Sequence, residues 1–506
     1  MSGILFFEAY FTCACIGAGI GACIGACISA VIKINNITEI VEKLTRRLTT
    51  EPSHENENSR NEESGLNCSG RILTTTNKVQ PPKKITYDSK KPIGMSHATV
   101  FEGLFENDMI VAVKRVHIDT DDTDQIINEY KHLQKKLRRQ IDINHKIMKS
   151  GHENVTKYYG YQIEGTHLLY ALELCNYHLE EFLLHHRHNC PPILDTDILL
   201  SMAKGLDFLH SKDIVHRDLK PSNVLMKIEN NNVIVKLSDF GMSKTLPETS
   251  SVASGSSESG TLGWMAPEVY IALEDLNTEI QFSRKSDIFP LGLLFYFVAS
   301  GGKYVFNTQD DIQNKNATYT GVVANDPLFN LVKDMHSPAP TDRPSAQEVK
   351  NHPALWNMEK VLDFYKKTSN LSMGLPVNNA PFTKNPIQVI TGTGNQMIPC
   401  QPFDWYQKLT LSVQQDLFPN VYGRRSHHGK GKGPRYDRLS VDSLIRAIRN
   451  NNEHYYELSI NLQNEYGSYP TGFLNYWTTK FPGLLMYAYD AMKLHSGDGS
   501  MAKFYE

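Results

Sequence analysis

The sequence predicts an α+β domain followed by a smaller all-α module, with one membrane-spanning helix close to the N-terminus. Three observations predict this fold class: an ordered series of phosphate-handling motifs within residues 85–365, an amphipathic helix over 440–450, and the uncharged stretch Ala9–Ile32. A length of 506 residues allows about three domains. Lysine plus arginine number 52 and aspartate plus glutamate 55, which excludes a wholly basic nucleic-acid binder but not a local basic patch.

Composition divides the chain into five parts. We expect an N-terminal transmembrane anchor at residues 1–33, a disordered linker at 34–84, folded domains at 85–365 and 403–506, and a second linker at 366–402. Both linkers are rich in polar residues and carry little periodic hydrophobicity, which is typical of tethers. The eight cysteines show neither zinc-finger spacing nor a disulfide framework, so the bulk of the chain suits a reducing cytosol.

The stretch Ala9–Ile32 is long enough to cross a bilayer as a helix, since about 20 apolar residues suffice. Glycines recur in it at every fourth position and would form a stripe on which two such helices can pack: Gly17, Gly21 and Gly25. Basic residues follow the stretch: Lys33, Lys43, Arg46 and Arg47. The positive-inside rule then places everything downstream in the cytoplasm. The alternatives are a cleaved signal peptide, which would need a basic start, and a buried soluble hairpin.

A series of motifs in the first folded region fits the transfer of a phosphoryl group. Lys114 lies in the strand-like run VAVKRV, and Glu129 on the helix that follows is suited to hold a lysine beside ATP phosphates. The segment HRDLKPSN supplies a candidate base, Asp218. Asp239 opens the triplet DFG, and its carboxylate suits Mg²⁺. Each motif alone is weak, but their order, with the triplet APE after them, is highly specific.

These motifs resemble those of eukaryotic protein kinases, which implies the bilobal α+β kinase fold with ATP or ADP and Mg²⁺ as cofactors. The resemblance assigns catalysis to Asp218 and Lys220, and Lys220 indicates a Ser/Thr kinase. It assigns the magnesium ions to Asn223 and Asp239. The nucleotide-binding residues that it implies are Gly94, Val100, Lys114, Glu129, Glu173 and Cys175. It also implies that the arginine of the later DRP triplet, Arg343, pairs with the glutamate of APE, Glu268.

The glycine-rich loop departs from this resemblance. Protein kinases carry a G-x-G-x-x-G-x-V loop, whereas residues 94–100 read GMSHATV and keep only Gly94. Glycines let backbone N–H groups approach phosphates closely. We therefore expect the loss of these glycines to impair phosphoryl transfer more than nucleotide binding. The segment ALELC is expected to form the hinge, where Glu173 and Cys175 bind adenine through backbone groups. Cys175 is interpreted as a spacer rather than as a nucleophile.

The activation segment between DFG and APE is rich in serine and glycine. A phosphate on serine adds about −1.5 to −2 charges and favours arginine, and Arg217 beside Asp218 is the natural partner. We expect autophosphorylation within one group of serines: Ser254, Ser256, Ser257 and Ser259. The alternative is a loop that is simply mobile.

The C-terminal folded region contains a short amphipathic helix over 440–450. Four apolar residues fall at i, i+3, i+4 and i+7 and would make a buried stripe: Val441, Leu444, Ile445 and Ile448. Ser440 is a fitting N-cap, and the asparagine run from Asn450 is expected to end the helix before His454. Further on, FLNYWTTKFPGLLMYAYDAMKL predicts two apolar helices split by Pro482.

The segments HPALWNMEK, SLIRAIRNNNEHYYEL and KFPGLLMYAYDAMKL, placed after a kinase, resemble the kinase-extension nuclease (KEN) family. This family comprises the inositol-requiring kinase/endoribonuclease of the unfolded protein response and ribonuclease L. The resemblance implies an all-α ribonuclease module, an RNA substrate, a homodimer through the kinase and KEN modules, and an endoplasmic reticulum membrane with cytosolic catalytic domains. By matched position, Arg449 and Asn450 bind the scissile phosphate. His454 and Tyr436 match the catalytic histidine and tyrosine, with Tyr422 as a less favoured alternative to Tyr436.

Metal-free cleavage of RNA needs a base for the 2′-hydroxyl, an acid for the leaving 5′-oxygen and a cation for the phosphorane. A histidine, a tyrosine and an arginine supply these without a cofactor, and the expected product carries a 2′,3′-cyclic phosphate. Residues 424–435 hold five Lys/Arg and no acid, and form either a loop that tracks RNA phosphates or a solvated insertion. Two rivals stay open: a Ser/Thr kinase whose C-terminal module only dimerises, and a pseudokinase scaffold for membrane signalling.

Overall fold

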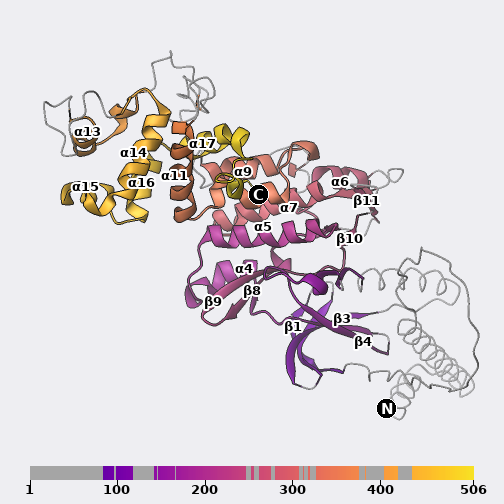
Figure 1. Cartoon of the computed structure of the whole chain (residues 1–506). Coiled ribbons are helices and arrows are strands. Elements are labelled where there is room, and N and C mark those ends of the chain that lie inside the picture. The colour runs from indigo at the N-terminus through magenta and orange to yellow at the C-terminus, as the bar shows by residue number, and fades with distance from the viewer. Residues whose placement is uncertain are drawn as a thin grey trace, which may run out of the picture. The chain divides into compact units, whose positions relative to one another are not determined.

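The computed structural model describes most of the chain from residue 84 onward. The described residues are 84–95, 98–106, 108–117, 142–144, 146–165, 167–246, 252–255, 261–274, 280–306, 311–312, 317–319, 326–374, 382, 404–419 and 436–505. They fall into two compact units, the first with residues 84–117 and 157–174 and the second with 142–156 and 175–505 (Figure 1). The predicted anchor, Glu129 and the basic loop lie outside the described residues. Where the chain is described, no helix is both long and apolar enough to span a bilayer.

The first unit contains a five-stranded antiparallel sheet in the order β1-β2-β3-β5-β4. Its strands are β1 (Ile85–Met95), β2 (Thr99–Phe105), β3 (Met109–His117), β4 (Tyr158–Glu164) and β5 (His167–Leu172). The pleat of β2 buries Phe101 and Phe105 and exposes Glu102 between them. Val111 and Val113 of the central strand β3 pack against these two rings and complete a small core.

The second unit up to residue 355 is mainly helical. Its helices are α4 (Leu179–Glu181), α5 (Asp195–Ser211), α6 (Pro267–Glu274), α7 (Arg284–Ala299), α9 (Pro327–Met335) and α10 (Ala346–Asn351). Its short strands are β6 (Tyr177–His178), β7 (Ile214–Val215), β8 (Val224–Glu229), β9 (Asn232–Leu237), β10 (Lys244–Thr245), β11 (Val252–Gly255) and β12 (Ile280–Ser283). Helix α7 is buried on every face from Ser286 to Val298, which fits an apolar helix at the centre of a domain.

The described residues between 356 and 505 form an all-α C-terminal module with its own hydrophobic core. Its helices are α11 (Met358–Gly374), α13 (Leu411–Leu417), α14 (Val441–Glu453), α15 (Ile460–Tyr466), α16 (Thr471–Lys480) and α17 (Leu484–Met492). Helix α11 contacts α14, α16 and α17 (Figure 1). The two apolar helices expected on either side of Pro482 are α16 and α17.

Helix α11 crosses the predicted boundary between residues 365 and 366 without a break. The helix continues to Gly374, within the range where a linker was expected from residue 366. Phe364 and Tyr365 are buried in the core of the C-terminal module, and the polar Thr368 and Ser369 one turn later are buried as well. Polar composition predicted a linker here because the apolar residues that hold the helix in the core, Phe364 and Tyr365, lie just before the polar stretch begins. The polar residues that follow belong to the same helix.

Helix α14 confirms the predicted stripe and N-cap but extends further than expected. The Ser440 hydroxyl accepts from the Ser443 backbone N–H at 3.2 Å, and all four stripe residues are buried. The asparagine run does not end the helix, which continues to Glu453 with His454 as its C-cap. The reason is tertiary: Asn451 is buried and its amide donates to the Tyr466 hydroxyl at 2.7 Å. This bond offsets the weak helix propensity of asparagine.

Candidate active sites

Three residues that were predicted to contact nucleotide lie in one row across the sheet of the first unit. Gly94 on β1 is opposite Val100 on β2, and Val100 is opposite Lys114 on β3. Directly opposite residues share a face of the sheet, so the strand register brings these three together. Met95 on β1 pairs with Thr99 on β2, so three residues separate the two paired positions where the glycine-rich loop was expected. An added Cβ at Gly94 would meet only the Val100 Cβ, at 3.9 Å, so this position does not sterically require glycine.

Glu173, at the end of the same unit, is buried and held to the neighbouring strand. Its carboxylate accepts from the Lys157 backbone N–H at 3.1 Å, and its own N–H donates to the Lys157 carbonyl at 2.9 Å. Because this N–H is engaged, we expect Glu173 to contact adenine through its backbone carbonyl oxygen. Cys175, in the second unit, is half-buried.

In the second unit, hydrogen bonds converge on the buried carboxylate of Asp218. One oxygen accepts from the Thr261 hydroxyl at 2.7 Å, and the other lies 2.9 Å from Lys220 Nζ. Asn223 Nδ2 donates to the same carboxylate at 2.9 Å and to the Asp218 backbone oxygen at 2.7 Å. Lys220 also donates to Thr261, at 2.7 Å. The three residues named from the sequence therefore meet, and they are joined by Thr261, which the sequence did not single out.

Asp239 is placed by hydrogen bonds that start from the same loop. Ser238, just before it, donates its N–H and its hydroxyl to the Asn223 carbonyl at 2.9 and 3.0 Å. His216 Nε2 donates to the Ser238 carbonyl at 2.9 Å. Asp239 then adopts φ +62°, a left-handed conformation that aspartate tolerates better than most residues. Asn223 and Asp239, which carry the oxygen ligands that Mg²⁺ prefers, are thus tied together through Ser238.

Asp287 on α7 fastens the catalytic loop to the core. Its buried carboxylate accepts from the backbone N–H groups of His216 and Arg217, each at 2.8 Å, and from His210 Nε2 at 2.9 Å. Hydrogen bonds to an ionised acceptor are about twice as strong as neutral ones, so this anchor fixes the backbone next to Asp218. The predicted pair of Arg343 and Glu268 is formed as well, with two parallel bonds of 2.7 and 2.8 Å.

Arg217 lies beside the activation segment. Its guanidinium is 3.9 Å from the centre of the Phe282 ring on β12, and β12 pairs with β11 of the activation segment. Ser254 is on β11, opposite Gln281. The other predicted phosphorylation positions, Ser256, Ser257 and Ser259, lie outside the described residues.

Asn450 lies at the centre of the residues predicted to cleave RNA. Its Oδ1 accepts from Arg449 Nε at 3.1 Å and from a terminal Arg449 nitrogen at 2.8 Å. Its Nδ2 donates to the Tyr436 hydroxyl at 2.9 Å, and the Tyr436 ring is buried. Its backbone oxygen accepts from the His454 N–H at 3.1 Å. The end of α14 and its C-cap thus place Arg449, Asn450 and His454 next to one another, and Tyr436 reaches Asn450 from the segment before α14. Tyr422 lies outside the described residues.

His454 is oriented by a carboxylate that the sequence did not single out. Its Nδ1 donates to Glu457 Oε2 at 3.1 Å, and its side chain is 56% exposed. This bond favours the tautomer in which Nε2 is the nitrogen available to a substrate. The sequence does show an acidic residue three positions after His454, but many exposed helical turns carry such a pair, so the spacing alone does not indicate a catalytic role.

Arg449 is also held by residues from outside its own turn. One terminal nitrogen donates to Asn370 Oδ1 on α11 at 2.6 Å, and Nε lies 3.9 Å from Glu453. Lys366 on α11 pairs with Glu453 at 2.8 Å. The hydrogen bond from Lys366, with Arg449 adding its charge, lowers the pKa of the Glu453 carboxyl. Helix α11 therefore sets both the position and the electrostatic surroundings of Arg449.

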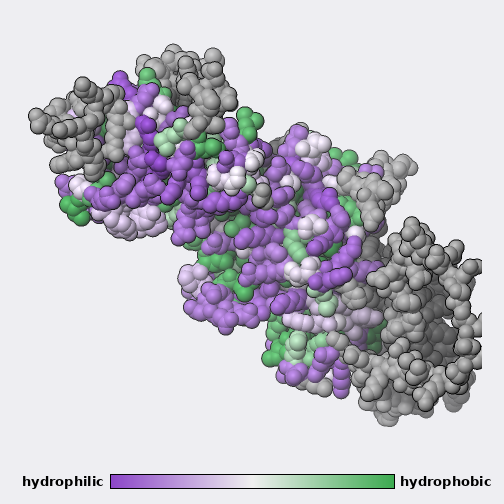
Figure 2. Space-filling model, in the orientation of Figure 1, coloured by the Kyte–Doolittle hydropathy of each residue, from purple (hydrophilic) through white to green (hydrophobic). Residues whose placement is uncertain are grey.

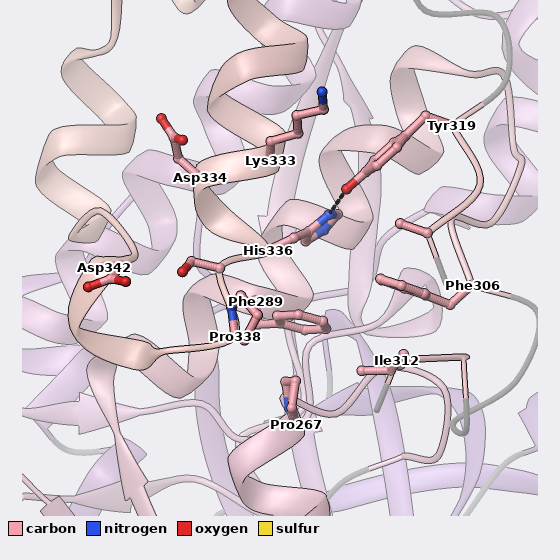
Figure 3. A pocket seen from close by; sticks show the side chains of 12 residues that line it. Pro267, Phe289, Phe306, Ile312, Tyr319, Lys333, Asp334, His336, Pro338 and Asp342 are labelled. Atoms are coloured by element: carbon pink, nitrogen blue, oxygen red, sulfur yellow. Dashed lines mark hydrogen bonds between the residues drawn. The ribbon is translucent and has the colours of Figure 1, made fainter. Parts of the chain in front are cut away.

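A half-open pocket of about 410 Å³ lies in the lobe that contains α7 and α9, and its lining includes Pro267 of the APE triplet and Asp342 of the DRP triplet. Figure 3 shows the Tyr319 hydroxyl reaching the His336 ring on one side, with Phe289, Phe306 and Ile312 on the other. The Tyr319 hydroxyl is 3.0 Å from His336 Nδ1. Burial, with the Arg343 guanidinium adding to it, lowers the pKa of His336 to about 3. The pocket therefore has a neutral imidazole in its wall across the physiological pH range.

We expect His336 to make the folded state sensitive to acid. Its folded pKa is lowered from about 6.5, so its contribution to stability is complete above about pH 6.5 and is lost as the pH falls below that value. At about pH 5 the loss amounts to about 2 kcal/mol. The check is urea unfolding at about pH 7.5 and about pH 5. His336→Gln, which keeps a partner for Tyr319, should lose about 2 kcal/mol less than the wild type over this interval. Equal losses in both proteins would contradict the expectation.

Comparisons with known proteins match both parts of the chain. Residues 87–355 match the protein kinase domain family and residues 362–505 match Ribonuclease 2-5A. The human serine/threonine-protein kinase/endoribonuclease IRE2 is 31% identical over 441 residues, covering 83% of this chain and 42% of the relative. The Caenorhabditis elegans serine/threonine-protein kinase/endoribonuclease ire-1 is 29% identical, with coverages of 81% and 39%. The Schizosaccharomyces pombe sensor for unfolded proteins in the ER ire1 is 29% identical, with 79% and 37%. The chain spans about two fifths of the length of these relatives.

Proposed function

The chain belongs to the kinase-extension nuclease family, in which a protein kinase domain precedes a Ribonuclease 2-5A domain, and from this premise we propose that it is a Ser/Thr protein kinase fused to a metal-independent endoribonuclease. The observation that carries the proposal is the cluster around Asn450. It joins a guanidinium, an amide and a phenol beside a solvent-exposed histidine that a carboxylate orients. These are the groups that cleavage of RNA without a metal requires.

In the proposed cleavage, the 2′-oxygen of the substrate attacks the neighbouring phosphorus and the 5′-oxygen leaves. His454 Nε2 takes the proton from the attacking 2′-hydroxyl while Nδ1 stays bonded to Glu457, and the Tyr436 hydroxyl gives a proton to the leaving 5′-oxygen. Arg449 and the Asn450 amide bind the phosphate, and Arg449 offsets the charge that develops on the phosphorane. The Tyr436 hydroxyl keeps Asn450 in place. The products are a 2′,3′-cyclic phosphate and a 5′-hydroxyl.

In the proposed kinase reaction, the row of Gly94, Val100 and Lys114 contributes the phosphate-binding part of the first unit. Asn223 and Asp239 would hold Mg²⁺, which would neutralise charge on the phosphates. Asp218 accepts the proton of the substrate hydroxyl as the γ-phosphoryl group is transferred and ADP leaves. The Lys220 ammonium, 2.9 Å from Asp218, is positioned to offset negative charge beside this base.

We further propose that Ala9–Ile32 anchors the protein in the endoplasmic reticulum membrane with both catalytic domains in the cytosol. Support comes from the absence of charge in this stretch and from the basic residues after it. A relative is named as a sensor for unfolded proteins in the ER, which supports a role in the response to that stress. Nucleotide binding would favour a homodimer through the kinase and KEN modules, in which the protein cleaves RNA.

The test of the proposed function is incubation of the full chain with an end-labelled stem-loop RNA, with EDTA and at a protein concentration that maintains the dimer. Cleavage should persist and the new 3′ ends should be cyclic phosphates. If no RNA is cut while label passes from ATP to protein, the chain is a kinase whose C-terminal module only dimerises. If neither reaction occurs, the pseudokinase scaffold takes its place.

A further inference from the structure

The residue two positions after His454 presents an aromatic ring to solvent. Tyr456 is 78% exposed, whereas Tyr455 beside it is buried. Tyr469, from the loop before α16, is 36% exposed, and its ring centre lies 5.8 Å from that of Tyr456. Figure 2 shows hydrophobic residues over α15, whose first residue, Ile460, is 68% exposed. Exposed aromatic and apolar side chains thus gather on the surface that adjoins His454.

The two exposed rings are held in place by the buried one. The Tyr455 hydroxyl donates to the backbone oxygens of Gln463 and Gly467. The Tyr455 ring lies 5.4 Å from Tyr456, edge on, and 5.1 Å from Tyr469. These separations are within the range of favourable aromatic pairs. The Tyr456 ring therefore packs against the fixed Tyr455 ring, even though most of its own surface faces solvent.

The same turn of the chain carries the histidine and the exposed ring. His454, Tyr456 and Glu457 belong to one 3₁₀ turn, closed by a hydrogen bond of 2.9 Å from the Glu457 N–H to the His454 carbonyl. We expect a polynucleotide whose phosphate reaches Arg449 and His454 to bring a flanking base to this turn, because the turn carries both His454 and Tyr456. Proteins that bind unpaired RNA stack such bases on tyrosine rings.

We propose that the exposed face of Tyr456, supported by the Tyr469 ring at an interplanar angle of 62°, is an aromatic platform on which a nucleobase next to the scissile phosphate stacks. This inference rests on the proposed ribonuclease function and adds the group that grips the substrate base. Stacking does not read hydrogen-bonding edges, so the platform accepts every base. It favours purines over pyrimidines, because a purine covers more of the ring.

The kinetic test compares Tyr456→Ala and Tyr469→Ala with the wild type on a single-stranded RNA loop. Loss of a stacking ring should lower kcat/KM about 5- to 150-fold, mainly through KM, and should reduce the preference for a purine. Tyr456→Phe, which keeps the ring, should behave like the wild type. Leu494→Ala removes another apolar side chain of the module, 92% exposed, and should change nothing. Equal kcat/KM for Tyr456→Ala and the wild type would overturn the platform.

A binding test separates the platform from the nuclease activity. The probe is an RNA with 2-aminopurine beside the cleavage position and a 2′-deoxy sugar there, so that it cannot be cut. Wild-type protein should quench the 2-aminopurine fluorescence and Tyr456→Ala should not. Quenching by a wild-type protein that cuts no RNA would refute the ribonuclease and keep the platform. RNA cleavage without quenching of the 2-aminopurine fluorescence would refute the platform and keep the ribonuclease. If Tyr456→Ala weakens dimerisation in sedimentation and quenches normally, the surface binds a second copy of the chain and the proposal fails.

Discussion

The His454→Ala variant should cleave RNA about 10²–10⁴-fold more slowly than the wild type, which is the usual contribution of a positioned proton-transfer group. The reason lies in the dyad with Glu457, which fixes the ring and leaves Nε2 for the substrate. The His454 side chain is largely exposed, so its removal opens no cavity, and the melting temperature should hold. Single-turnover rates with end-labelled RNA, together with thermal unfolding, check both expectations.

Two further variants show whether the effect belongs to this site. His495→Ala removes another histidine of the same module and should cleave at the wild-type rate. Arg449→Ala should cost at least as much as His454→Ala, because it leaves the charge of the phosphorane without its cation. If a folded, dimeric His454→Ala protein cut RNA as fast as the wild type, the module would be a dimerisation domain and the kinase-only interpretation would lead.

Asp218→Ala should abolish phosphoryl transfer while nucleotide-stimulated RNA cleavage stays largely intact. Loss of the base lowers transfer by at least about 10²–10⁴-fold. The substitution leaves the backbone of the loop anchored through Asp287, and the nucleotide and metal residues of the site are retained. Transfer of label from ATP and cleavage of RNA, measured on the same preparation with ADP present, give the two readouts.

The matched controls for this prediction are two other aspartates. Asp197→Ala, at an exposed position on the first turn of α5, should leave both activities unchanged. Asp239→Ala should weaken binding of the magnesium nucleotide and should reduce RNA cleavage through that loss. If Asp218→Ala lost cleavage while it still bound ATP and dimerised, the separation of the two activities would be wrong.

The sequence predicted those parts of the sites that are encoded close together along the chain. Arg449, Asn450 and His454 fall within one turn and a half of a helix, so their proximity follows from helical periodicity. Asp218, Lys220 and Asn223 share one loop. The same locality explains why the Ser440 cap and the buried stripe of α14 were predicted correctly.

Contacts between distant segments could not be predicted in this way. Asn370 reaches Arg449 because α11 packs on α14, and Thr261 reaches Asp218 because the activation segment returns to the catalytic loop. Such contacts depend on how helices and loops pack, which local patterns do not encode. The length of α14 was underestimated for the same reason, since the bond between Asn451 and Tyr466 is tertiary.

Helix α11 limits where a genetic crossover can separate the kinase domain from the nuclease domain. Its first turns supply Phe364 and Tyr365 to the core of the C-terminal module, and its last turns supply Lys366 and Asn370 to the surroundings of Arg449. A genetic crossover between residues 365 and 366 would give one descendant a module with part of its core missing and the other an unsupported helical stub. A crossover that keeps these contacts intact has to fall before α11, between the kinase match that ends at residue 355 and the start of the helix at Met358.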